Sequence, residues 1–116
     1  MTAPRWVSLW YRGAAIYGGI ALILAALAPS PALPLDHYGF VFTALAFQGV
    51  FWVIGGDPVR HRAIVPWSVG EKLAFGVPCV VLFAQGRIEP TALVFGLIDL
   101  ALGAGFLLAW RATPKA

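Results

Sequence analysis

Asp99 is the residue of this sequence best placed to carry chemistry, because it is an ionisable group within the apolar stretch Thr91–Trp110. An aspartate at the centre of a bilayer costs about 2.5–3.5 kcal/mol, and such residues serve proton relays or ligand sites. Counted from the outer helix ends, Asp99, Gln48 and Tyr17 lie about 12, 15 and 16 Å deep. We therefore expect these three residues to form an intramembrane polar site. The alternative is a helix-packing hydrogen bond from a protonated Asp99 carboxyl to Gln48 or Tyr17.

A second polar layer is expected nearer the cytoplasmic boundary. Arg12, Glu71 and Lys72 all fall about 21–24 Å from the outer side. Glu71 is expected to pair with Arg12 and to complete a helix-opening capping box that begins at Ser68. Lys72 is expected to extend to the membrane interface. With no cation at its own depth, Asp99 is expected to be neutral.

The inner loop 57–67 carries the third group of candidates, Arg60, His61 and Arg62. This segment is typical of a helix-stop turn followed by an anchor for lipid headgroups, with phosphate binding or partner docking as the alternative. His37 and His61 lie at opposite membrane faces, and Cys79 is the single cysteine. We therefore assign no metal, no cofactor and no catalytic residue.

Four apolar stretches must position these side chains: Gly13–Ala28, Tyr38–Gly56, Val69–Gln85 and Thr91–Trp110. Each is long enough to cross a bilayer as an α-helix, if the first begins inside its aromatic flank. Charged residues make up 11% of the chain, against about 25% in a soluble domain. The sequence predicts an all-α polytopic membrane protein: one domain, 1–116, with an antiparallel bundle of transmembrane helices at about 5–28, 38–56, 68–86 and 91–111.

Small residues mark the faces on which these helices pack. In the first helix they recur at Ala14, Gly18, Ala21, Ala25 and Ala28, and in the fourth at Ala92, Gly96 and Gly103. Such spacing lets a neighbouring backbone approach closely. Asp99 shares the face of the fourth helix and is expected to point into the bundle. Trp6, Trp10 and Tyr11 are expected to form an interfacial aromatic belt.

The basic residues predict the orientation of the chain. If the N-terminus is cytoplasmic, seven of the eight lysines and arginines lie inside, and only Arg87 lies outside. This bias predicts cytoplasmic termini, in a bacterial inner membrane. The formal charge of +3 is therefore a topology signal, and no nucleic-acid partner is expected.

The chain resembles a group of small, uncharacterised four-helix bacterial membrane proteins that are similar in size and layout to DoxX-like proteins. The resemblance rests on Tyr38-Gly39-Phe40, Gly56-Asp57-Pro58-x-Arg60-x-Arg62, Glu71-Lys72 and Asp99. It implies a fold and a membrane but no activity. Small multidrug transporters carry an essential glutamate in the first helix, which is absent here, and quinone-reducing four-helix proteins carry a CxxC that is also absent. No fluoride-channel motif is present.

The leading functional expectation is a non-enzymatic accessory or structural subunit of a larger membrane complex, or a homo-oligomer. Its partners would be the lipid bilayer and other membrane subunits or further copies of itself. The first alternative is a transporter or binder of a small or lipophilic molecule at Asp99 and Gln48. The second is a membrane enzyme that uses Asp99 or Glu71 as acid or base. A cavity that reaches Asp99 favours the alternatives, whereas a dry seam closed by Tyr17 and Gln48 favours the subunit.

Overall fold

The computed structural model describes residues 2–28 and 32–115. These residues form four long helices and no strand: α1 (Arg5–Leu27), α2 (Pro34–Gly56), α3 (Val65–Ala84) and α4 (Pro90–Ala112), with a 3-10 turn at Arg62–Ile64. Each apolar span has 23 residues, which is about 34 Å of helix and enough to cross a bilayer core. The predicted all-α bundle of a multi-pass membrane protein is confirmed.

Two helices begin earlier than the apolar pattern indicates. Pro34 opens α2 in its first turn, a position where proline loses no helical hydrogen bond. Asp36 lies within that first turn. The start of α3 at Val65 places Ser68 inside the helix, where its hydroxyl donates to the Val65 carbonyl at 2.6 Å. The capping box predicted from Ser68 is therefore wrong.

The far end of α3 is closed by a glycine. Gly86 has a φ of +70°, a backbone conformation that costs a side chain energy and that glycine adopts freely. Its N–H donates to the Phe83 carbonyl, and the Arg87 N–H donates to the Leu82 carbonyl, both at 2.9 Å. This Schellman pairing ends α3 at Ala84, two residues before the predicted boundary.

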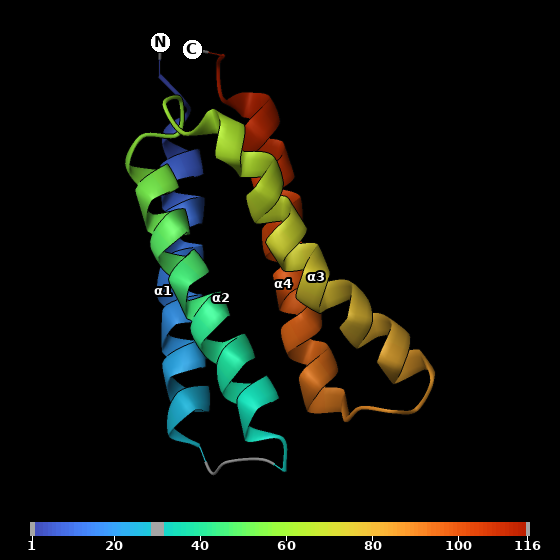
Figure 1. Ribbon diagram of the computed structural model, residues 1–116. Coiled ribbons are helices and arrows are strands. Elements are labelled where there is room, and N and C mark those ends of the chain that lie inside the picture. Colours follow the sequence, from blue (N-terminus) through green and yellow to red (C-terminus); the bar gives the residue numbers. More distant parts are fainter. Residues whose placement is uncertain (1, 29–31, 116) are drawn as a thin grey trace.

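The bundle consists of two helical hairpins (Figure 1). α1 packs along α2 and α3 packs along α4, and both chain termini lie at the same end of the molecule. Glycines permit the close approaches: a Cβ on Gly76 would lie 2.5 Å from the Leu100 side chain. We call the helix ends opposite the termini the distal ends.

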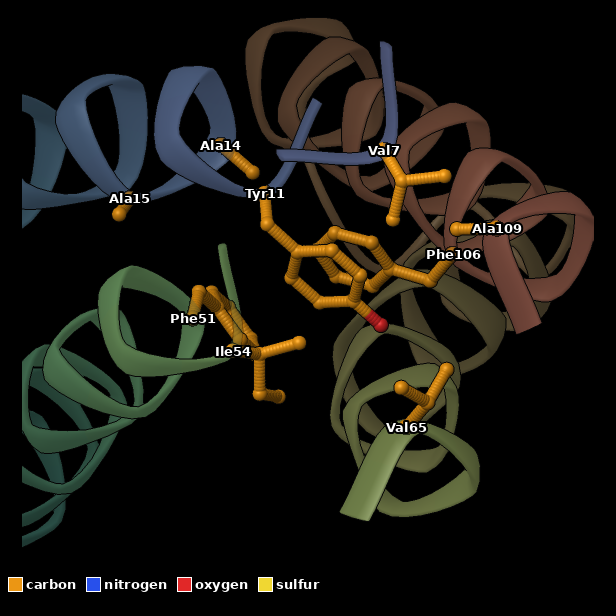
Figure 2. Packing of buried hydrophobic residues seen from close by; sticks show 9 residues of the cluster. All are labelled: Val7, Tyr11, Ala14, Ala15, Phe51, Ile54, Val65, Phe106 and Ala109. Atoms are coloured by element: carbon orange, nitrogen blue, oxygen red, sulfur yellow. The ribbon is translucent and has the colours of Figure 1, made fainter. Parts of the chain in front are cut away.

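An aromatic core joins the hairpins in the half of the bundle nearest the termini (Figure 2). Tyr11 stacks on Phe106 with ring centroids 4.1 Å apart, and Phe51 packs against both rings. The Tyr11 hydroxyl shares a 2.7 Å hydrogen bond with Ser68 Oγ. That bond satisfies the hydroxyl inside the core. The expectation that Tyr11 belongs to an interfacial belt is wrong, because its side chain is 0% exposed.

Candidate intramembrane binding site

A cavity of about 280 Å³ lies between the two hairpins. All four helices line it. The apolar part is formed by Gly18, Ala21, Leu22, Ala25, Phe40, Ala44, Phe75, Ala92 and Phe95, and the polar part by Tyr17, Gln48, Glu71, Lys72 and Asp99. Ala25 and Ala92 lie close to the distal ends, whereas the polar residues lie about 14–21 Å from those ends by helical rise. The cavity therefore has an apolar distal part and a polar floor.

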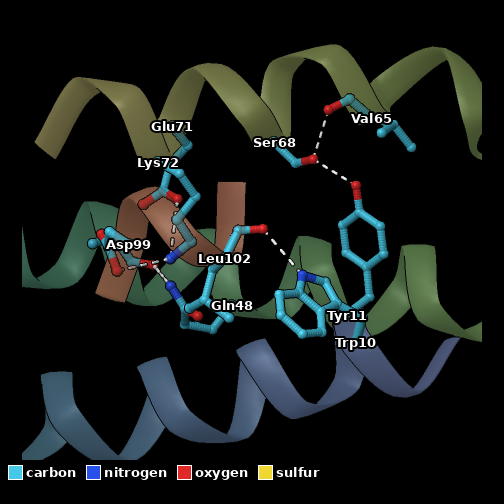
Figure 3. Close-up of polar contacts among 10 residues, drawn as sticks. Trp10, Tyr11, Gln48, Val65, Ser68, Glu71, Lys72, Asp99 and Leu102 are labelled. Atoms are coloured by element: carbon cyan, nitrogen blue, oxygen red, sulfur yellow. Dashed lines mark hydrogen bonds and ion pairs between the residues drawn. The ribbon is translucent and has the colours of Figure 1, made fainter. Parts of the chain in front are cut away.

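An ion cluster forms this floor (Figure 3). Lys72 Nζ lies 3.4 Å from Asp99 Oδ1 and 3.5 Å from Glu71 Oε2. The side chains of Lys72, Glu71 and Asp99 are only 3%, 14% and 16% exposed. Asp99 points into the bundle, as expected, but the expectation that it has no cationic partner is wrong. The expectation of a neutral Asp99 carboxyl depended on the absence of a cation, so it is no longer supported.

The lysine stem explains how two predicted polar layers become one site. By helical rise, Lys72 lies about 18 Å and Asp99 about 14 Å from the distal ends of their helices. A four-carbon stem easily covers that difference. The Lys72 stem runs beside Gly103, where an added Cβ would approach Lys72 Cβ at 3.0 Å. Lys72 therefore points into the bundle, and the prediction that it extends to the interface is wrong.

Gln48 is part of the polar floor, but its side-chain hydrogen bonds are not all satisfied. Its side chain is 6% exposed, and its Nε2 donates to the Ala44 carbonyl of the same helix at 2.8 Å. Its Oε1 lies against Gly18 and has no hydrogen-bond partner among the described residues. Tyr17 lines the cavity beside it. Among the described residues, neither Gln48 nor Tyr17 forms a hydrogen bond with Asp99. The helix-packing hydrogen bond that was the alternative to a polar site is therefore not formed.

Arg12 stays outside the cluster. Its guanidinium lies 4.3 Å from the centre of the Trp52 ring, and its side chain packs against Gly55 and Gly56 at the contact of α1 with α2. Among the described residues Glu71 pairs with Lys72, so the predicted pair of Glu71 with Arg12 is wrong. A cation over an indole face is itself attractive, which accounts for the position of Arg12.

The three inner-loop candidates are separated by the fold. Arg62 turns toward α4, where its Nε donates to the Thr113 carbonyl at 2.9 Å and its Nη2 to the Trp110 carbonyl at 3.2 Å. These bonds satisfy carbonyls at the C-terminal end of a helix. Arg60 is exposed and His61 half-buried. A role of this loop in headgroup or partner docking stays a prediction.

Sequence reasoning missed the aromatic walls of the cavity. Phe75 follows Glu71 by four residues, and Phe95 precedes Asp99 by four. Residues four apart share a helix face, so this spacing was a usable signal. Phe40 stacks on Phe75 across α2 and α3, with ring centroids 5.4 Å apart. A second hollow of about 450 Å³ lies on the α2–α3 side of this pair and shares Phe40, Ala44, Glu71 and Phe75 with the cavity.

Metal and family comparisons add no assignment. Within residues 2–28 and 32–115, no three His, Cys, Asp or Glu side chains come together as a metal site requires. No protein-family model, curated protein or solved structure matches the chain.

Proposed function

We propose that this protein binds a small lipophilic molecule in the cavity between its two hairpins. The observation that carries the proposal is a cavity with apolar distal walls and a polar floor, lined by residues of all four helices. Ligand sites in proteins combine apolar walls with a few convergent polar groups. The volume of about 280 Å³ is close to the lower end of the range of such pockets, which is about 300–1,000 Å³.

The aromatic core gives this site one closed end. Phe51 lies behind the floor, with its ring 5.1 Å from Lys72 Nζ, and Tyr11 and Phe106 fill the space beyond it. All three side chains are fully buried. A closed end supports binding or carriage of a molecule over an open pore. The accessory-subunit role remains compatible with a bound lipophile, but the cavity favours the binder.

A cavity-filling variant tests the proposal. Ala21→Leu adds bulk to the α1 wall of the cavity, whereas Ala101→Leu adds the same bulk to an exposed position of α4 that does not line it. Each protein is purified in mild detergent, extracted with organic solvent and analysed by mass spectrometry. We expect a small lipophile in wild-type and Ala101→Leu extracts and its loss from Ala21→Leu. Identical extracts from all three proteins would contradict the proposal.

We also propose that the protein resides in a bacterial inner membrane with both termini in the cytoplasm. The support is the distribution of basic residues: apart from Lys72 on the cavity floor, six of the remaining seven lie toward the termini and only Arg87 lies at the distal end. His61→Cys, made together with Cys79→Ser, provides a single accessible thiol for labelling in intact cells. Labelling by a membrane-impermeant maleimide from the periplasmic side would refute the orientation.

A further inference from the structure

Resting on the proposed binding function, we infer that the ligand is an amphipathic cation whose protonated amine lies on the polar floor. The first observation is the charge of the floor. Lys72 is its only cation within the described cavity lining, and it faces the carboxylates of both Glu71 and Asp99. With all three groups ionised, the floor has a formal charge of −1. A ligand ammonium would balance it.

The second observation is an excess of hydrogen-bond acceptors. Gln48 Oε1 and Glu71 Oε2 are both buried without a hydrogen-bond partner among the described residues. Among the described residues, the 3.5 Å contact with Lys72 Nζ is the charge contact of Glu71 Oε2. A buried acceptor left unsatisfied destabilises the fold. An ammonium brings only donors and no acceptor, so it supplies what the floor lacks.

The third observation is the aromatic lining. Tyr17, Phe40, Phe75 and Phe95 all border the cavity. The face of an aromatic ring attracts a cation electrostatically, and the attraction increases when the cation leaves water. An anionic head would instead meet two carboxylates and the negative faces of rings, with Lys72, already paired to both carboxylates, as the one cation of the described lining. Charge, hydrogen bonding and wall chemistry therefore favour the same head group.

Four probes with the same tail test the charge of the head. Octylammonium, octyltrimethylammonium, octanol and octanoate are titrated by calorimetry into the protein in nanodiscs of zwitterionic phosphatidylcholine, with empty nanodiscs subtracted. We expect octylammonium to bind at least about tenfold more tightly than octanoate. Octyltrimethylammonium keeps the charge but has no N–H, so we expect its affinity to fall between those of octylammonium and octanol.

Two variants connect this preference to the floor. Asp99→Asn and Glu71→Gln each remove one negative charge and keep the side-chain shape, and we expect each to abolish most of the preference for octylammonium. Ala101→Leu, on the exposed face of α4, should retain it. Two separate variants keep the test decisive if one of them does not fold.

The outcomes separate this inference from the proposed function. Equal binding of all four heads, tighter binding of octanoate, or a preference that survives both charge variants would overturn the cation assignment alone. Binding of no probe above the empty-nanodisc blank, with wild type and Ala21→Leu indistinguishable, would overturn the binding function itself.

Discussion

Replacing Lys72 with methionine should destabilise the bundle strongly, because one cation balances two carboxylates. Lys72 Nζ lies 3.4 Å from Asp99 and 3.5 Å from Glu71. At an effective dielectric constant of about 20, each contact has a gross Coulomb energy of about 5 kcal/mol. Desolvation of the charges opposes much of this energy, and removing one partner of a buried pair costs about 3–5 kcal/mol. We expect Lys72→Met to lower the free energy of unfolding by about that amount.

A double variant separates charge from packing in this prediction. Asp99→Asn in the Lys72→Met background removes one of the two uncompensated carboxylates, so it should recover part of the lost stability. Asp99→Asn alone should cost less than Lys72→Met, because Glu71 still faces the lysine. Unfolding is measured by titration with SDS in mixed micelles, followed by far-UV circular dichroism. Leu73→Met, at a neighbouring exposed position of α3, is the control.

Two results would refute this reasoning. The first is a Lys72→Met protein as stable as the Leu73→Met control, because then no buried charge is left uncompensated. The second is a double variant no more stable than Lys72→Met itself, because then the loss comes from packing of the lysine stem rather than from charge.

Three further predictions concern packing contacts of the bundle. Gly18→Ala places a Cβ onto the Gln48 carboxamide, whereas a Cβ on Gly19 would meet nothing within 4 Å; because the carboxamide is the end of a flexible side chain and can shift toward the cavity, SDS titration should show Gly18→Ala less stable than Gly19→Ala by up to about 1 kcal/mol. Tyr11→Phe removes a buried hydroxyl that shares a 2.7 Å hydrogen bond with a serine of α3, so SDS titration should give a loss of about 1 kcal/mol. Arg62→Ala removes two hydrogen bonds to carbonyls at the C-terminal end of α4, so amide exchange should accelerate in the last turn of α4 and remain unchanged at its proline-led start.

The fold was predictable because its main determinant is the length of apolar runs. A bilayer requires about 20 consecutive apolar residues per helix, and the sequence supplies four such stretches. The helix starts were less predictable, because Pro34 and Val65 extend the helices beyond the apolar pattern. A first-turn proline is compatible with both a loop and a helix start, so periodicity alone does not decide between them.

The candidate site was predictable in its members but not in its connections. Depth along a helix placed Asp99 and Gln48 together, and both line the cavity. Depth alone misassigned Lys72 and Arg12, because it describes Cα positions and ignores the length and direction of long side chains. The tertiary contacts then decide which way each cation extends: beside Gly103 and into the cavity for Lys72, and onto the Trp52 ring for Arg12.

The two buried polar networks of this bundle differ in a way that bears on function. In the aromatic core, the Tyr11 hydroxyl bonds Ser68, and Ser68 in turn bonds the Val65 carbonyl, so every hydroxyl has a partner. On the cavity floor, Gln48 Oε1 and Glu71 Oε2 are without one in the described structure. A network that served packing alone would be expected to be satisfied, because each orphaned buried group weakens the fold. Arg12 Nε, beside Trp52 and outside the cavity lining, is also buried without a partner in the described structure, so an unsatisfied group alone does not mark a ligand site. The cavity floor differs because both of its unsatisfied groups are acceptors beside an open space, which is the arrangement expected where a ligand supplies the missing donors.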